Sequence, residues 1–202
     1  MNGSFRVGDS TGYVRRVASS DAIGWGPDGI GFDLVRDCYA ARFGRMAFEI
    51  ARADLGGLAE ARCTYSREEE RIAIDRVTLA RPLEPLRVMC RYRIDGREAG
   101  TLRLVADTDT GASSADGRKG MITILGTNIA LQTRHCLAET NANISDPSGY
   151  VMMNSDGQTV GAIELTGGGS RRAILPNNAA QHKSALLAAI TLALLWDPGN
   201  VG

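Results

Sequence analysis

The chain has 202 residues, with 23 Lys and Arg against 23 Asp and Glu, so its formal net charge is zero. This balance argues against a protein that binds nucleic acid through bulk charge, although it leaves room for a local basic patch. With 44% hydrophobic and 23% charged residues, the composition is that of a globular domain and not of a disordered chain. The length favours one domain, which we expect to cover residues 1–202.

Neither the N-terminus nor the cysteines indicate secretion. The opening sequence MNGSFRVGDS has no apolar stretch of the kind found in signal peptides. The longest apolar run, 185–196, is too short to cross a bilayer core. The cysteines Cys38, Cys63, Cys90 and Cys136 are widely spaced and contain no CxxC pair, so we interpret them as buried thiols. We therefore expect a cytoplasmic protein that spans no membrane and holds no metal or cofactor.

The dominant pattern is a series of short alternating apolar runs, broken by turn residues about every 8 to 12 positions, which is typical of an antiparallel β sandwich or barrel. The first such runs are 4–8, 13–18 and 30–35. Residues 38–62 are ambiguous, because the apolar positions from Phe43 to Ala51 fit a helix as well as a strand. We favour a hairpin that turns at residues 54–57, because its neighbours are strands.

The clearest hairpin joins 86–94 to 98–106 through Asp95-Gly96, since a type I′ turn needs positive φ at both central residues. The polar stretch 107–120 then predicts an exposed loop, which trypsin should cut first, after Arg118 or Lys119.

Further strands are expected at 121–125, 129–136, 150–153, 160–165 and 171–175, for a total of about twelve. Those at 150–153 and 160–165 flank the turn sequence Asn-Ser-Asp-Gly and predict another hairpin.

The last element is a helix over 179–196, preceded by Asn177 and Asn178 as capping residues. From residue 185 on it has no charged face, and its only polar residue, Thr191, can bond back to the carbonyl four residues earlier. A helix that is apolar all round must be buried all round, so we expect a closed sheet to surround it. Leu187, Ile190 and Leu194 should then be nearly inaccessible.

The segments GYVMMNSDGQTVGAIEL (149–165), GGGSRRAILP (167–176) and LLWDP (194–198) resemble the C-terminal part of the tubby-like superfamily. That group includes the tubby C-terminal domain, the phospholipid scramblases and the LURP-one-related proteins. The resemblance covers about the last 80 residues, including the strand with Leu131, Arg134 and His135. It implies a closed antiparallel barrel of about twelve strands around a hydrophobic C-terminal helix, so that the whole chain is one tubby-like domain.

The chain departs from these relatives in its ligand-binding residues. No basic cluster aligns with the phosphoinositide-binding residues of tubby, and the cysteine-rich stretch of scramblases is absent. The sequence DTDTG at 107–111 resembles the start of a calcium loop, but the glycine at position six and the glutamate at position twelve are missing. Lipid binding is therefore not transferred residue by residue.

Anion binding is the chemistry that the sequence itself supports best. Arg171 and Arg172 follow a run of three glycines, while Arg118 and Lys119 end the polar loop, and Arg134 lies on a nearby strand. Arginine grips phosphate through two parallel hydrogen bonds, so these five residues are the candidate anion site, with ordinary surface charge as the alternative.

No catalytic residues are assigned. Adjacent strand residues point to opposite faces, so His135 and Cys136 do not meet as a pair. His182 lies in the first turns of the helix, where a binding role is the weaker alternative to a structural one. The charge cluster at 67–71 is interpreted as a solvated surface.

The function that follows is a non-enzymatic binding module, whose ligand is a phospholipid headgroup, another small anion or a protein partner. One alternative is a structural or assembly subunit that acts through protein–protein contacts. Another is a small-ligand barrel, or an enzyme, with a pocket at the barrel mouth. Nucleic acid is not an expected partner.

Overall fold

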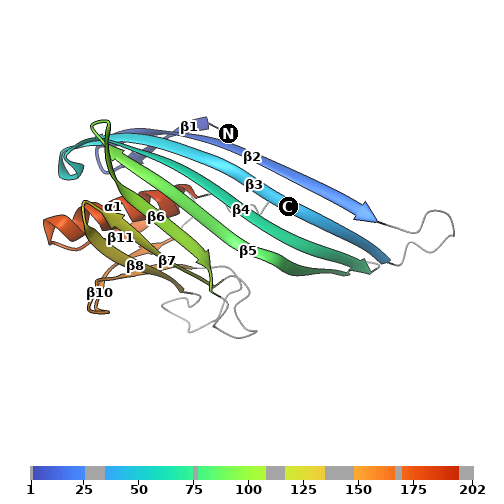
Figure 1. Cartoon of the computed structure of the whole chain (residues 1–202). Helices are drawn as coiled ribbons and strands as arrows, with labels where there is room; N and C mark the ends of the chain where they lie inside the picture. The colour runs from blue at the N-terminus through green and yellow to red at the C-terminus, as the bar shows by residue number, and fades with distance from the viewer. Residues whose placement is uncertain are drawn as a thin grey trace.

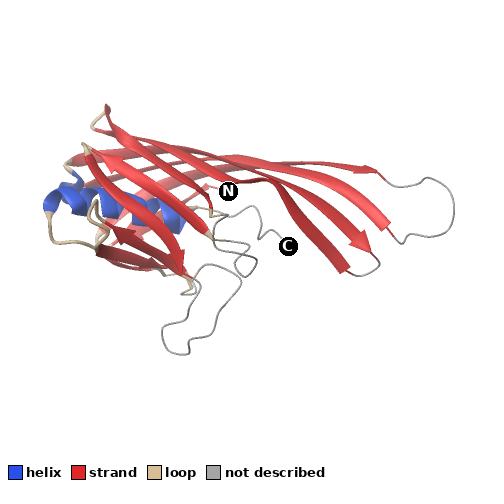
Figure 2. Ribbon diagram, turned by 60° about the horizontal axis from the view of Figure 1, so that its bottom comes forward, coloured by secondary structure: helices blue, strands red, loops and turns tan. Residues whose placement is uncertain are grey.

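The computed structural model describes residues 2–25, 35–74, 77–107, 117–134, 148–166 and 170–195. These residues form a mainly β structure in which one antiparallel sheet is followed by a single α-helix (Figures 1 and 2). The elements are β1 (Asn2–Val7), β2 (Ser10–Trp25), β3 (Val35–Arg52), the 3-10 helix η1 (Ala53–Leu55), β4 (Gly57–Ile74), β5 (Val77–Ile94), β6 (Arg97–Ala106), β7 (Arg118–Ile124), β8 (Thr127–Arg134), β9 (Gly149–Met153), β10 (Thr159–Glu164), β11 (Arg172–Ile174) and α1 (Ala179–Leu194).

The sheet is a simple meander of eleven strands, because every strand pairs only with its neighbours in sequence, from β1 to β11. β1 and β11 are its two edges, and no pairing among the described residues joins them. The expected antiparallel sheet is confirmed, but the expected closure into a barrel of about twelve strands is not seen among the described residues. The described sheet has eleven strands, is antiparallel and is open.

The sheet has two parts with different surroundings. At one end it curves around α1, and the inward-facing side chains of β2–β10 form the hydrophobic core with the helix. At the other end β2–β5 continue past the last residues of β6 as a four-stranded extension that projects away from the helix (Figures 1 and 2). The alternation of apolar and polar residues explains why the sheet curves around α1, because one face of each strand is apolar and packs against the helix while the other face is polar.

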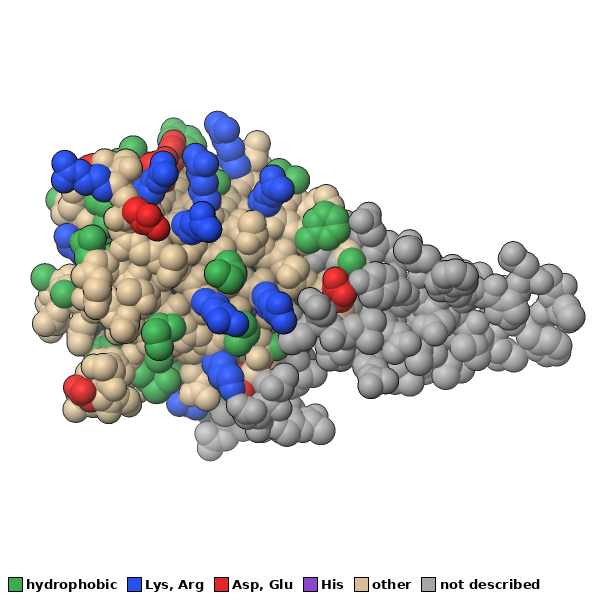
Figure 3. Space-filling model, viewed as in Figure 1, with side chains coloured by type: hydrophobic (Ala, Val, Ile, Leu, Met, Phe, Trp, Pro, Cys, Tyr) green, Lys and Arg blue, Asp and Glu red, His purple; other side chains and the backbone are tan. Residues whose placement is uncertain are grey.

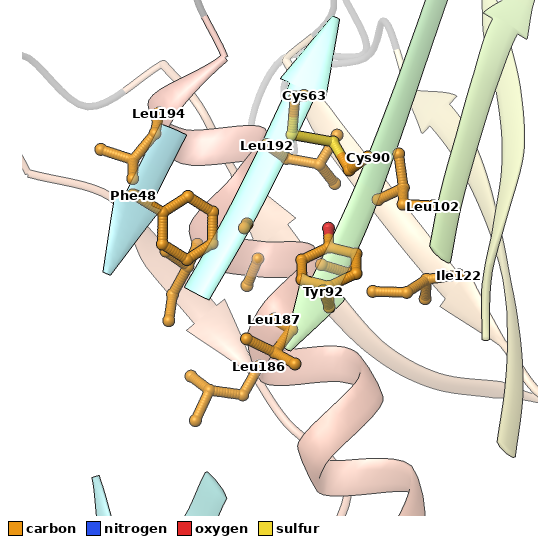
Figure 4. Packing of buried hydrophobic residues seen from close by; sticks show 14 of the residues in the cluster. Phe48, Cys63, Cys90, Tyr92, Leu102, Ile122, Leu186, Leu187, Leu192 and Leu194 are labelled. Carbon is orange, nitrogen blue, oxygen red and sulfur yellow. A yellow bond between two sulfur atoms is a disulfide. The ribbon is translucent and has the colours of Figure 1, made fainter. Parts of the chain in front are cut away.

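The helix is buried as its composition predicts. The Asn178 side chain caps it by accepting from the backbone N–H groups of Ala180 and Gln181 at 3.1 and 3.2 Å. Leu187, Ile190 and Leu194 are 0%, 4% and 8% exposed, which confirms that they are nearly inaccessible. Figure 4 shows the helix leucines packed against side chains of β3–β7.

Thr191 is one of two buried polar residues of α1, and its hydroxyl makes two hydrogen bonds. It bonds back to the carbonyl of Leu187 at 2.7 Å, as the sequence predicts, and it also lies 2.7 Å from the Tyr92 hydroxyl on β5. A second polar contact, from Ser184 Oγ to the carbonyl of Thr127 on β8, holds the N-terminal half of the buried segment. Satisfied buried hydrogen bonds of this kind help to specify one position of the helix in the core.

The turn predictions are confirmed. β3 and β4 form the expected hairpin across η1, so the helical alternative for 38–62 was wrong. Asp95 and Gly96 have φ of 48° and 73°, both positive as a type I′ turn requires. The hairpin of β9 and β10 is also present.

The cysteine prediction needs a correction. Cys63 on β4 and Cys90 on β5 are buried, at 2% and 1% exposure, but they are joined in a disulfide and are not free thiols. They are direct cross-strand partners with Cα atoms 4.0 Å apart. The spacing of 27 residues gave no hint of this, because only the strand register brings them together. Cys136 and the side chain of Cys38 lie outside what the structure describes.

The loop predicted at 107–120 is shorter than expected. Asp107 N–H donates to the Gly117 carbonyl at 2.6 Å, and β7 already begins at Arg118, while 108–116 lie outside the described residues. Trypsin should therefore not cut first after Arg118, because this side chain is 7% exposed within a strand.

Candidate functional site

Arg118, the first of the predicted anion-binding residues, points into the molecule. Its Nη1 donates to the Tyr150 hydroxyl at 3.5 Å, and its backbone N–H donates to Thr133 Oγ1 at 2.9 Å. A charged side chain in this position is almost never buried without partners. Arg118 is therefore buried where β7 packs against β8 and β9, and it is not an exposed anion ligand.

Lys119 points outward but is engaged in an ion pair. Its Nζ lies 3.0 Å from Asp107 Oδ1, so a carboxylate of the same region already occupies it. Arg134 is exposed at the end of β8, where its carbonyl accepts from the backbone and the side chain of Ser148.

Arg171 and Arg172 are both exposed, and β11 begins at Arg172. The strand register places Arg172 opposite Glu164, Glu164 opposite Gly149, and Gly149 opposite Arg134. Arg134 and Arg172 therefore share one row but lie three strands apart, which is about 14 Å. A carboxylate stands between them, so the predicted residues do not converge on one small anion.

The remaining candidates from the sequence either lie outside the described residues or have a structural role. His135, Cys136 and the glycines 167–169 lie outside the described residues. His182 has a structural setting: its Nδ1 is 3.1 Å from the Pro176 carbonyl and its Nε2 is 3.5 Å from Asp54 Oδ2. Asp54 also accepts from Arg52 at 2.6 Å, and this hydrogen bond holds the pKa of the carboxyl below its usual value. These contacts anchor the start of α1 to η1.

A different group of side chains forms the strongest candidate site. Six of the exposed arginines at outward-facing positions of β2–β6 form a group that we call the arginine face: Arg15, Arg45, Arg62, Arg87, Arg91 and Arg103. Their neighbours along each strand, such as Val14, Cys63 and Val88, point into the core. The alternation of the strands therefore puts all six on the outer surface.

The register packs these arginines into three adjacent rows across the sheet. Arg15, Arg62 and Arg91 lie in the first row, Arg45 and Arg103 in the second, and Arg87 in the third. Strands are about 4.8 Å apart and alternate residues about 6.8 Å, so the six side chains occupy an area of about 19 by 14 Å.

No acidic residue stands in these three rows at the positions where the described strands β2–β6 pair. The acidic side chains Glu49, Glu60 and Glu98 all lie in the next row toward η1, together with Arg93. Among the described residues, none of the six arginines takes part in an ion pair or a side-chain hydrogen bond. Positive charge is thus concentrated on a surface of a chain whose net charge is zero.

Arg62 and Arg91 are the most unusual members, because they face each other directly across β4 and β5. Directly opposed like charges destabilise a sheet by about 0.2–1 kcal/mol. Opposed like charges also occur at Glu49 and Glu60 in the next row, so this pair indicates a binding role only together with the lack of acidic residues in its own row.

The arginine face is hollowed and partly apolar. A groove of about 700 Å³ runs over β2–β6, and its lining includes Arg15, Arg45, Arg62 and Arg91. A second hollow of about 590 Å³ adjoins it, with Arg45 and Arg87 in its lining.

Apolar side chains stand between and beside these cations. Val17, Phe43, Met89 and Met121 are 63%, 42%, 53% and 50% exposed. In Figure 3 Lys and Arg side chains gather on one face of the described part, with hydrophobic side chains between them.

The chemistry of this surface suits the binding of anions. Guanidinium groups stay charged at all physiological pH values and offer paired donors that fit phosphate, sulfate and carboxylate. The described lining of the 700 Å³ groove contains no carboxylate and no imidazole that could act as a general base. The surface therefore suits an anionic ligand that also has an apolar part.

Sequence reasoning missed the arginine face, although it left room for a local basic patch. A signal exists in the segment LRVMCRYRI (86–94), where arginines alternate with core residues. The same alternation at Arg15, Arg45 and Arg62 is visible only when the pairing of four strands is known.

Comparisons with known proteins found no matching family model, no matching curated protein and no matching solved structure. Among the described residues, none of the helical segments is both long and apolar enough to cross a membrane.

Proposed function

We propose that this protein is a non-enzymatic binding module that holds anionic ligands on its arginine face, with a phospholipid headgroup at a membrane surface as the leading ligand. The observation that carries the proposal is the group of six exposed arginines, for which the described residues provide no acidic partner. Each unpaired guanidinium near an anionic lipid surface contributes about 1 kcal/mol of attraction.

The exposed apolar side chains favour a lipid over a small soluble anion. Met89 and Val17 line the groove beside the arginines, so a ligand that meets the charges also meets hydrocarbon. Exposed apolar groups of this kind on a charged surface mark interaction sites, and at a membrane they reach the boundary between headgroups and acyl chains.

We also propose that the chain is a tubby-like domain. In support, an antiparallel meander curves around an apolar C-terminal helix, as the resemblance implies. A closed barrel would further require a pairing between β1 and β11. A cytoplasmic location stays a prediction from the sequence, and the Cys63–Cys90 disulfide argues against it, because disulfides form and persist in oxidising compartments.

Vesicle flotation tests the function. The parent protein is expected to float with vesicles of phosphatidylcholine and phosphatidylserine and to stay behind with phosphatidylcholine alone. The double variant Arg62→Gln/Arg91→Gln should lose most of this binding. The matched control is Arg171→Gln/Arg172→Gln, which removes the same charge from another exposed surface and should bind like the parent.

Two outcomes would overturn the proposal. Equal losses from both double variants would indicate unspecific surface charge. Failure of the parent to float would exclude a phospholipid headgroup as the ligand. A thermal-shift titration with pyrophosphate would then show whether a soluble anion binds the same arginines.

The open sheet edges favour a second candidate, an assembly subunit. β1 and β11 are the outermost strands of the described sheet, and edge strands pair readily with other chains. Light scattering across a concentration series would reveal such association, and a strict monomer would exclude it.

A further inference from the structure

The opposed pair Arg62 and Arg91 lies directly beside the disulfide. Arg62 precedes Cys63 on β4, and Arg91 follows Cys90 on β5, so the two cross-strand pairs are adjacent rows of the same two strands. The disulfide points into the core at 2% and 1% exposure, while both arginines are exposed on the outer face. One covalent bond therefore lies under the surface that carries two facing guanidinium groups.

The two arginines repel each other and have no described acidic partner to hold them together. Without a cross-link, only the hydrogen-bond ladder and the packing of the core hold the two strands together against this repulsion. The covalent bond between the residues next to the pair adds a restraint of its own. Cys63 and Cys90 have Cα atoms only 4.0 Å apart, which holds the backbones of β4 and β5 close at this point.

The core beneath the pair adds to this constraint. Tyr92 follows Arg91 on β5 and is 0% exposed, with its hydroxyl bonded to Thr191 of the helix. Ala61 precedes Arg62 on β4 and is 1% exposed. Each arginine is thus flanked on its own strand by two buried residues, and its strand position is fixed on the inner side.

We propose that the Cys63–Cys90 disulfide is a positioning element of the arginine face, which holds Arg62 and Arg91 at the separation at which both guanidinium groups bind one anionic group. The inference rests on the proposed function, and it identifies this pair as the centre of the surface. The two arginines repel each other in the unbound protein, and the ligand removes this repulsion, because an anion between two cations neutralises both. A preorganised pair binds more tightly than one that must be brought together.

A double-mutant cycle tests the proposal. The disulfide is removed by Cys63→Ala/Cys90→Ala, and the dissociation constant for vesicles of phosphatidylcholine and phosphatidylserine is measured by flotation. Removing the disulfide should weaken binding about tenfold, which is within the range of coupling between contacting groups. In the Arg62→Gln/Arg91→Gln background the same removal should change the dissociation constant by less than about twofold, because the pair is no longer there to be positioned.

Arg103 supplies the matched control. It is an exposed member of the arginine face on β6, but it lies in another row and is not next to a cysteine. The loss caused by Arg103→Gln should be the same with and without the disulfide. A merely structural disulfide would weaken all arginine contributions alike, so it would not reproduce this difference.

Folding is checked by circular dichroism and thermal unfolding before binding is compared. If Cys63→Ala/Cys90→Ala does not fold, Cys63→Val/Cys90→Val keeps an apolar cross-strand pair without the covalent bond and takes its place. An unchanged dissociation constant in a folded variant overturns the inference and leaves the proposed function standing. Binding by the parent that does not depend on Arg62, Arg91 or Arg103 overturns the proposed function itself.

Discussion

Replacing Thr191 by valine should destabilise the protein more than replacing Tyr92 by phenylalanine, although both changes remove the same hydrogen bond. The Thr191 hydroxyl donates its single proton to the Leu187 carbonyl at 2.7 Å. The Tyr92 hydroxyl, 2.7 Å away, must then be the donor to Thr191 Oγ1. Both residues are 0% exposed, so water cannot take the place of a hydrogen-bond partner that a substitution removes.

The magnitudes follow from what each variant leaves behind. Tyr92→Phe removes one hydrogen bond and leaves Thr191 bonded to Leu187, for a loss of about 1 kcal/mol. Thr191→Val keeps the shape of the side chain but leaves the Tyr92 O–H buried without an acceptor, for a loss of about 1–3 kcal/mol. The double variant leaves no buried donor without an acceptor. Its loss of unfolding free energy should therefore be smaller than the sum of the two single losses and close to that of Tyr92→Phe.

Urea unfolding of the parent, the two single variants and the double variant measures these free energies. Thr191→Ser is the control, because it keeps the hydroxyl and loses only a methyl group. Two results would refute the reasoning: a Thr191→Val protein as stable as Tyr92→Phe, or single losses that simply add. Either would mean that the Tyr92 proton is not directed at Thr191.

Three further predictions concern the same core. Burial raises the pKa of the Tyr92 hydroxyl above its usual value. Its contribution to stability is therefore complete below about pH 10, where the unfolded chain keeps the proton, and declines as the pH rises further. The free energy of unfolding, measured against pH, should decline less in Tyr92→Phe than in the parent, and an identical slope would contradict this. Gly100→Ala should cost about 3 kcal/mol or more, because Gly100 has φ of 154° and a Cβ there would lie 1.8 Å from a backbone oxygen; Gly3→Ala, with open space around it, is the control in the same unfolding assay, and equal stability of the two would refute the close contact. Leu194→Asp should abolish cooperative unfolding by placing an unpaired charge in the core, whereas Leu58→Asp, at a 42% exposed position, should remain folded by circular dichroism; a cooperative Leu194→Asp protein would show that the helix is not enclosed.

Local chemistry determined the parts of the fold that the sequence predicts correctly. The Asp95-Gly96 turn follows from the residues that tolerate positive φ, and the start of α1 follows from the oxygen of the Asn178 side chain. The burial of Leu187 follows from the lack of a charged face on its helix. Each of these depends on residues within about one turn of each other, so no knowledge of the partner strands is needed.

Strand pairing decided what the sequence leaves open. The arginine face arises from the register of β2–β6. The register of β4 against β5 brings Cys63 and Cys90 together across 27 positions of the chain. The pairing of β7 with β6 likewise buries Arg118, a residue whose sequence neighbours suggest an exposed loop. Whether the sheet closes around the helix also depends on its two edge strands, which are the most distant in sequence. A strand's alternation specifies which of its residues share a face, but only tertiary pairing specifies what lies beside them, because backbone hydrogen bonds are the same for every residue and carry no register of their own.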